Sequence, residues 1–383
     1  MFLLVFAVFC VSWPLVDPTS NKIDCDTKPN NNSCNQVSCA ETPCTMQCGL
    51  ETHDQYDSCR QICLPSRCDA LECRASEYCL QLCSLSNCGS LTCDAMACDQ
   101  SCYMGNCSSL TCGKTSVRCK QNSGSELTCE ANACTQSCFR EECRLTCPLG
   151  GANCTQEARE SIADMKCDRN VCEQQCSLGQ CNMNCSSSVM PGFCRQVCNF
   201  GTCEFMTCNA KQCIQVCQDT KCAMTCPREA KKCSQFGYVP LLGRITMKCD
   251  GVECQQSCYN GDCDMMCPHG VSTCTQEAYD GNMTLRCDAD ECHQVCYRDN
   301  CIMTCSETVN QCDQFCFKGN CQYKCYAKIC KHSCLAGPCK EGNSLASTLP
   351  AVTTTRTKFN GASLQKTSFL WGALIITYNS LFV

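Results

Sequence analysis

Cysteine is the residue whose abundance and spacing decide what chemistry this chain can do. Of its 383 residues, 57 are cysteine, and most neighbours are separated by three or four residues. Thiols bind metals, act as nucleophiles or pair as disulfides. The C-x-C and C-x2-C clusters that hold structural metal ions do not occur in the sequence. The spacing therefore indicates disulfides formed in an oxidising compartment, with no metal and no other cofactor.

Other reactive residues are sparse. Histidine occurs only at His53, His269, His293 and His332, and no serine-hydrolase, zinc-protease, phosphate-loop or dinucleotide-binding motif is present. We therefore expect no catalytic activity and no small-molecule substrate. The net charge of −6 is small for this length, so nothing in it points to a nucleic-acid partner.

The apolar content explains the need for cysteine. The chain has 13 Phe, 10 Tyr and 2 Trp, so little apolar surface remains once cysteine is set aside. A cysteine fraction of roughly one in seven is typical of secreted scaffolds in which disulfides replace a large hydrophobic core.

Two tripeptides alternate along the chain. In the first, glutamine stands two residues after a cysteine, at Gln36, Gln61, Gln81, Gln100, Gln121, Gln136, Gln156, Gln174, Gln196, Gln215, Gln235, Gln256, Gln276, Gln294 and Gln314. In the second, an apolar residue stands two residues before a cysteine, at Ile23, Met46, Leu71, Leu91, Leu110, Leu127, Leu145, Met165, Met183, Met206, Met224, Met247, Met265, Leu285, Met303 and Tyr323. His332 occupies a sixteenth glutamine position, where we expect it to replace an amide and not to act catalytically.

The period of about 20 residues predicts an all-β, disulfide-stapled solenoid. Each unit contains the segments C-x-Q-x-C and C-x-M-x-C, separated by turns rich in Gly, Asn and Asp, as in Cys172 to Cys185. Alternating residues mark one face of a strand, which gives two strands per rung and about 16 rungs in a rod of about 75 Å. Helical hairpins built on C-x3-C, and irregular disulfide-knit repeats, are the alternatives.

Comparison among the repeats predicts which cysteines pair. In four rungs, the cysteine after the glutamine and the cysteine before the apolar residue are both replaced, by Ser123 and Ser125, Ala158 and Ala163, Gly237 and Ile245, and Ala278 and Met283. Cysteines that disappear together are expected to be bonded to each other. This predicts bridges across the turn within a rung, including Cys102–Cys107, Cys176–Cys181, Cys258–Cys263 and Cys296–Cys301.

The remaining cysteines fall into neighbouring pairs that flank the other turn. These predicted bridges include Cys25–Cys34, Cys129–Cys134, Cys167–Cys172, Cys249–Cys254, Cys287–Cys292 and Cys325–Cys330. The competing assignment, Cys172–Cys185 across a rung, fits most repeats but leaves Cys25 and Cys330 unpaired. Stacked glutamines are expected to bond amide to amide along the rod, with stacked Leu and Met filling the remaining space.

Both ends of the chain resemble processing signals. Residues 1–20 contain an apolar run typical of a secretory signal peptide, whose loss removes Cys10 and leaves an even number of cysteines. The repeat domain spans 21–340, and a Ser/Thr-rich stalk spans 341–360. Small residues from Asn360, a polar spacer and an apolar tail predict lipid anchoring at Asn360, with 361–383 as the GPI-attachment propeptide. A short membrane anchor and an ordinary tail are the alternatives.

Several sequons are consistent with a secreted glycoprotein. N-x-S/T motifs occur at Asn31, Asn106, Asn153, Asn184 and Asn282. The middle residue is a cysteine in the motifs at Asn106, Asn153 and Asn184, so early bridging there favours Asn31 and Asn282 as acceptors.

In composition, leading apolar segment and repetitiveness, the chain resembles the lineage-restricted cysteine-rich secreted proteins of the skeletal organic matrix of stony corals. The resemblance implies a structural role in a biomineral matrix. It does not extend to the Cys-Cys dipeptides or aspartate-rich runs of some of those proteins, neither of which occurs here.

These observations predict a non-enzymatic structural component of the cell surface or extracellular matrix. Its partners are expected to be other matrix or cell-surface proteins and, through a GPI anchor, the membrane. The alternative is an extracellular binding module or adhesion receptor that recognises a ligand through one solenoid face. A contiguous exposed aromatic or charged ladder would favour the binding module, whereas an unpatterned polar surface would favour the scaffold.

Overall fold

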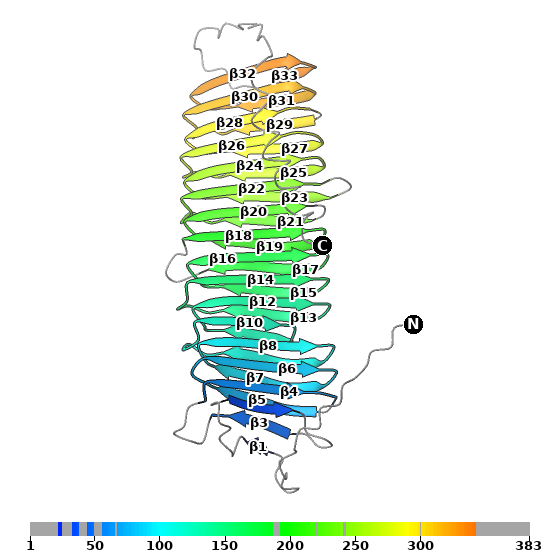
Figure 1. Ribbon diagram of the computed structural model, residues 1–383. Coiled ribbons are helices and arrows are strands. Elements are labelled where there is room, and N and C mark those ends of the chain that lie inside the picture. Colours follow the sequence, from blue (N-terminus) through cyan, green and yellow to red (C-terminus); the bar gives the residue numbers. More distant parts are fainter. Residues whose placement is uncertain are drawn as a thin grey trace, which may run out of the picture. The chain divides into compact units, whose positions relative to one another are not determined.

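A computed structural model of the chain describes residues 22–24, 33–37, 44–49, 56–65, 67–186, 192–218, 221–239, 243–298 and 300–341. These residues form a β-solenoid in which the chain winds through two facing parallel sheets (Figure 1). The predicted fold, with two strands per rung and a period near 20 residues, is confirmed, and the helical alternative is wrong. None of the described residues forms a helix with the length and hydrophobicity needed to cross a bilayer.

The two sheets contain alternate strands of the chain. The 16-stranded sheet, here called the glutamine sheet, consists of β2 (Ser33–Val37), β4 (Ser58–Cys63), β6 (Tyr78–Ser84), β8 (Ala97–Tyr103), β10 (Arg118–Asn122), β12 (Ala133–Phe139), β14 (Asn153–Arg159), β16 (Val171–Ser177), β18 (Phe193–Asn199), β20 (Gln212–Gln218), β22 (Lys232–Tyr238), β24 (Glu253–Tyr259), β26 (Thr273–Ala278), β28 (Glu291–Cys296), β30 (Gln311–Lys318) and β32 (Ile329–Ala336).

The 17-stranded sheet, here called the methionine sheet, consists of β1 (Lys22–Asp24), β3 (Cys44–Cys48), β5 (Arg67–Arg74), β7 (Asn87–Asp94), β9 (Asn106–Cys112), β11 (Glu126–Cys129), β13 (Glu142–Cys147), β15 (Ile162–Cys167), β17 (Gln180–Ser186), β19 (Thr202–Asn209), β21 (Cys222–Cys226), β23 (Arg244–Cys249), β25 (Asp262–Cys267), β27 (Asn282–Cys287), β29 (Asn300–Cys305), β31 (Asn320–Cys325) and β33 (Cys339–Glu341).

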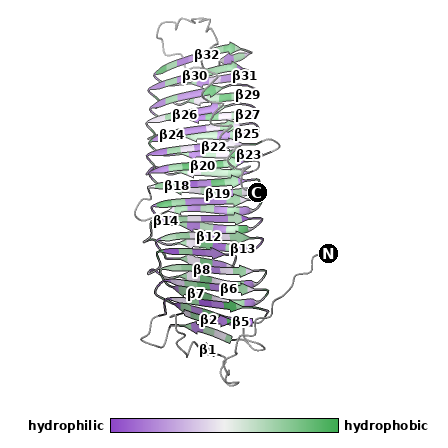
Figure 2. Cartoon of the chain, viewed as in Figure 1, coloured by the Kyte–Doolittle hydropathy of each residue, from purple (hydrophilic) through white to green (hydrophobic). Residues whose placement is uncertain are grey.

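Register is kept from rung to rung, so that identical residues stack. Between β12 and β14, for example, Cys134 lies beside Cys154 and Gln136 beside Gln156. Alternate side chains of a strand point to opposite faces, and those of the Cys, Gln and Cys columns therefore point inward. Figure 2 shows the resulting mixture of hydrophilic and hydrophobic residues along the strands. Where a rung has an extra residue, as at Phe205 in β19, the ladder absorbs it as a local register shift.

The core consists of a few stacked residue types. Each full rung contributes a disulfide at each edge, one glutamine from the glutamine sheet and one Leu or Met from the methionine sheet. Leu71, Leu91 and Met206 are completely buried, as are most of the glutamines. Such a core needs few large apolar side chains, which agrees with the composition.

The glutamine side chains form a continuous hydrogen-bonded ladder, as predicted. Each Nε2 donates to the Oε1 of the glutamine one rung earlier, at 2.8 to 2.9 Å, from Gln61 to Gln314. In many rungs Nε2 also donates to backbone carbonyls of the facing methionine sheet, as Gln81 does to Leu71 and Thr92. Both side-chain groups of the amide are therefore satisfied inside the rod, which a buried polar group requires.

The ladder runs in one direction and ends at Gln314. The buried Oε1 of Gln314 has no hydrogen-bond partner. His332 lies in the next glutamine position, as the register of β30 and β32 shows, but it is exposed and does not extend the ladder. Its ring lies 5.4 Å from that of Tyr323, which occupies the Leu/Met column. Burial raises the pKa of Tyr323 to about 12, and its hydroxyl donates to the Ser333 carbonyl.

One rung contains a buried arginine that the sequence pattern did not predict. Arg169 stands where other rungs have a buried alanine such as Ala131 or Ala210, and only 1% of its surface is exposed. Its Nη2 donates to the Cys129 carbonyl at 2.8 Å, whereas Nε and Nη1 have no partner. Gly151, one rung earlier, leaves room for the guanidinium, because a Cβ there would overlap it.

This contact predicts coupling between the two positions. Gly151→Ala should destabilise the fold by about 1–3 kcal/mol through overpacking. The double variant Gly151→Ala/Arg169→Ala should recover part of that loss, because it removes the overlap with the guanidinium but keeps the close approach, 2.7 Å, of a Cβ at position 151 to the Ala131 carbonyl oxygen. Denaturant unfolding of the two single variants and the double variant measures the coupling, and additive effects would contradict the contact.

The ladder predicts a large cost for removing one amide. Gln196→Met keeps the length of the side chain but leaves the Gln174 Oε1 unpaired and removes one of the three acceptors of Gln215 Nε2. The unsatisfied buried oxygen alone should cost about 1–3 kcal/mol. Arg195→Met, on the exposed face of the same strand, is the matched control and should change stability by less than about 0.5 kcal/mol. Equal unfolding midpoints for the two variants would show that the ladder contributes little.

Candidate functional site

The predicted bridging cysteines meet at the two edges of the solenoid. The structure joins them as Cys102–Cys107, Cys129–Cys134, Cys167–Cys172, Cys176–Cys181, Cys249–Cys254, Cys258–Cys263, Cys287–Cys292, Cys296–Cys301 and Cys325–Cys330. Cys34 is also disulfide-bonded, whereas Cys25, its predicted partner, lies outside the described residues. Cys172 does not pair with Cys185, which is bonded to Cys194.

The two edges differ in how much length variation they accept. Bridges across the turn from the glutamine sheet to the methionine sheet join cysteines five residues apart, as in Cys63–Cys68 and Cys334–Cys339. We call this the uniform edge. Bridges across the opposite turn span separations from 5, in Cys93–Cys98, to 11, in Cys48–Cys59. Each described bridge therefore staples a turn, and none joins one rung to the equivalent position of the next.

In three of the four rungs that lack a uniform-edge bridge, other buried residues fill the vacated space, whereas Ser125 in the fourth rung is exposed. Ala158 and Ala163 are buried in register with bridged cysteines of the rungs on either side. Ala278 and Met283 do the same in a later rung. In these two rungs, the paired replacement therefore preserves packing although the disulfide is missing.

The cysteines of the described residues are not available as metal ligands. Several sets of three sulfurs lie within 4.8 Å of one another, including those of Cys63, Cys68 and Cys88. The sulfurs of these sets are disulfide-bonded. A disulfide sulfur has no thiolate to offer, and metal binding by cysteine requires the thiolate.

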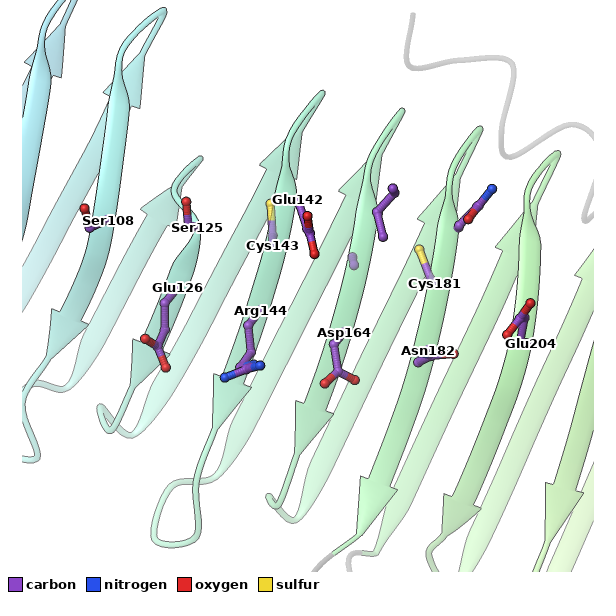
Figure 3. A pocket seen from close by; sticks show the side chains of 13 residues that line it. Ser108, Ser125, Glu126, Glu142, Cys143, Arg144, Asp164, Cys181, Asn182 and Glu204 are labelled. Atoms are coloured by element: carbon purple, nitrogen blue, oxygen red, sulfur yellow. The ribbon is translucent and has the colours of Figure 1, made fainter.

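A shallow groove of about 600 Å³ lies on the outer face of the methionine sheet. Glu126, Arg144 and Asp164 follow one another in register across β11, β13 and β15 (Figure 3). Cys143 and Cys181 also line it, but both are disulfide-bonded. The lining residues include no histidine and no free thiol, so the groove offers mixed charge without a nucleophile and base pair.

The uniform edge carries an exposed apolar stripe along much of its length. Its members are Leu64, Leu85, Tyr103, Met104, Phe139, Ile162, Leu178, Phe200, Tyr238, Tyr259, Phe317 and Leu335. Leu85, Met104, Leu178 and Phe200 have φ between 50° and 57°, a left-handed conformation that costs a bulky residue free energy. More than half of the surface of each of these residues is exposed, so burial offsets little of that cost, and folding alone does not explain the stripe.

Near the C-terminal end, the stripe becomes an aromatic stack. Tyr259 and Tyr279 have ring centroids 4.1 Å apart, Tyr279 and Tyr297 4.4 Å, and Tyr297 and Phe317 4.9 Å. The rings are nearly parallel, with interplanar angles of 7° to 13°. Burial and the neighbouring Glu277 carboxylate raise the pKa of Tyr297, and burial raises that of Tyr279 further, so both phenols are protonated at neutral pH.

The described sequons lie on the surface. Asn106, Asn153, Asn184 and Asn282 are exposed, and the cysteines inside the first three sequons are in disulfides. Asn282 Nδ2 donates to Asp262 Oδ1 at 3.1 Å. Asn31, Asn360 and the segments 1–20, 342–360 and 361–383 lie outside the described residues.

No protein-family model matches the chain, and neither a curated protein nor a solved structure shows significant similarity to it. Inferences about function therefore depend on the rungs, their edges and the exposed stripe. The disulfides themselves indicate an oxidising, extracellular type of environment.

The paired alanines give a direct test of the stapling geometry. Ala158→Cys/Ala163→Cys should form a new uniform-edge bridge and add about 2 kcal/mol of stability by the chain-entropy model. The single variant Ala158→Cys should keep a free thiol and gain nothing. Thiol titration and unfolding curves measure both effects, and two free thiols in the folded double variant would contradict the geometry.

Proposed function

We propose that this chain is a non-enzymatic structural component of the cell surface or extracellular matrix, where it acts as a rigid, disulfide-stapled rod. The observation that carries the proposal is the core itself. Disulfides hold the turns and a continuous amide ladder holds the rungs, so the chain is built for stiffness along one axis. The outer groove is shallow and its lining holds no reactive pair, which supports a role without catalysis.

The proposal also covers where the rod is located and how it is attached to the cell. Secretion, a Thr-rich stalk and a GPI anchor at Asn360 would hold it at a membrane, beside other cell-surface or matrix proteins. Glycans on exposed sequons such as Asn282 would add a hydrated coat. A skeletal or biomineral matrix is one such setting, suggested by the resemblance to coral matrix proteins.

A second candidate function is supported by the apolar stripe. The contiguous aromatic ladder from Tyr238 to Phe317 is the feature expected of a binding module or adhesion receptor. Large exposed apolar patches on soluble proteins commonly mark interaction sites. In this version, the rod presents a ligand-binding edge and does not act only as a spacer.

Two variants distinguish the structural function from the binding function: one shortens the rod, and the other removes aromatic residues from the exposed stripe. Deleting 171–211 joins Asn170 to Gln212 and removes two rungs, and the register of Val171, Phe193 and Gln212 is kept. The full-length protein, the deletion variant and a Tyr238→Ser/Tyr259→Ser/Phe317→Ser variant would be expressed in secretory animal cells. Each would be labelled on intact cells and in the matrix.

For a structural rod, we expect all three proteins to reach the same extracellular location without free thiols. The deletion should lower an N-terminal tag by about 10 Å relative to the membrane, because each rung rises about 4.8 Å. Phospholipase release of the full-length protein tests the anchor. Loss of retention in the triple variant alone would support the binding module, and retention in the cytosol with free thiols would contradict both functions.

A further inference from the structure

The aromatic stack places three phenols in contact on consecutive rungs. Tyr259 is the last residue of β24, and Tyr279 and Tyr297 directly follow β26 and β28 at the uniform edge. Their ring centroids are 4.1 and 4.4 Å apart. Phe317 continues the stack at 4.9 Å but has no hydroxyl. The edge is open to solvent, since Tyr259 is 37% exposed.

A carboxylate lies beside the central phenol. The Tyr279 hydroxyl donates to Glu277 Oε2 at 3.3 Å, and the Ser257 hydroxyl reaches the same oxygen at 3.4 Å. A phenol that loses an electron becomes a strong acid, so a neighbouring base helps one-electron oxidation by accepting the proton. Glu277 is positioned to do this for Tyr279.

We propose that Tyr259, Tyr279 and Tyr297 form an oxidative cross-linking site, in which a peroxidase using hydrogen peroxide couples Tyr279 to one of its neighbours as dityrosine. Each of the two phenols gives up one electron and one proton, and the two phenoxyl radicals join through ortho carbons. The two ortho C–H protons then move to the phenol oxygens. One peroxide is reduced to two waters for each C–C bond formed.

The product would supply a kind of bond that the described disulfides do not. Those bridges join cysteines 5 to 11 residues apart and close turns, whereas a link from Tyr279 to Tyr259 joins positions 20 residues apart on successive rungs. Tyr279 also follows Ala278, in a rung that lacks its uniform-edge bridge. The cross-link would therefore lock rungs together where stapling is weakest.

Other described tyrosines lack the combination of stacked phenols and a carboxylate. Tyr238 lies in register with Tyr259 one rung earlier but does not share the stacked contact that joins Tyr259 to Tyr279. Tyr323 lies against His332, and its hydroxyl is bonded to the backbone. Tyr103 is 63% exposed and lies beside Ser84 in the register of β6 and β8, not beside another tyrosine. It is accessible to the oxidant and serves as an internal comparison for the stack.

The test treats dilute, disulfide-intact full-length protein with a haem peroxidase and hydrogen peroxide. We expect dityrosine fluorescence, and a cross-linked peptide pair with the mass of the two peptides less two hydrogens, joining Tyr279 to Tyr259 or Tyr297. Tyr279→Phe keeps the ring stack but separates the phenols of Tyr259 and Tyr297 by two rungs, so it should abolish both links. Tyr238, which lies in register with Tyr259, is the one remaining neighbouring phenol, and the same comparison in a Tyr238→Phe background removes it. Tyr103→Phe should leave the yield unchanged, and Glu277→Gln should slow the reaction.

Three results would overturn the proposal. These are no dityrosine in the folded protein, undiminished dityrosine in Tyr279→Phe, and links found only between chains through Tyr103 or Tyr238. Because the readout is chemical and not a location, these results would leave the proposed structural function standing.

Discussion

The hydrogen-bonded glutamine ladder is the constraint on which the rest of the solenoid depends. A buried amide without partners costs about 1–3 kcal/mol for each unsatisfied group, and the ladder removes that cost only if each glutamine lies directly over the previous one. The 2.8 to 2.9 Å contacts therefore fix the register of the glutamine sheet, rung by rung. Extra residues are accepted only away from it, in turns and in bulges such as that of β19.

Disulfides and the ladder act in different directions. The described bridges hold the turns, which sets the width of each rung and the spacing between the sheets. Contacts between rungs are non-covalent and consist of backbone ladders, stacked Leu and Met, and the aligned amides. Loss of a bridge, as at Ala158 and Ala163, is therefore tolerated when small apolar residues fill the space. Every glutamine position from Gln36 to Gln314, by contrast, keeps its amide.

Much of the fold could be predicted because sixteen copies of the repeat serve as an internal comparison. Cysteines that are lost together in the same repeats indicated which turns are closed by disulfides. The regular spacing of Gln36 and its equivalents predicted the hydrogen-bonded ladder. The contact between Arg169 and Gly151 could not be predicted in this way, since it occurs in one rung and depends on the path of one long side chain. The groove at Arg144 was not predicted for a similar reason. The charged residues on the outer face of the strands differ from one repeat to the next, so comparing the repeats does not reveal them.

The aromatic stack was visible in the sequence but was not singled out. Tyr238, Tyr259, Tyr279, Tyr297 and Phe317 each directly follow the last inward residue of a glutamine-sheet strand. The outward residues directly before the glutamines, such as Arg60, Leu80 and Asp99, follow no pattern, so this side of the strands gives no sign of an ordered exposed column. Only the three-dimensional arrangement shows that rings one rung apart lie parallel and in contact.

Hydrogen exchange of the glutamine side-chain amides, followed by NMR, tests the central claim most directly. If the ladder holds the rungs, the Nε2 protons of Gln100, Gln196 and Gln256 should exchange as slowly as the most protected backbone amides of the sheets. The exposed Gln180 should exchange at the rate of a free side chain. Fast exchange of the ladder amides in the folded, disulfide-intact protein would contradict the account.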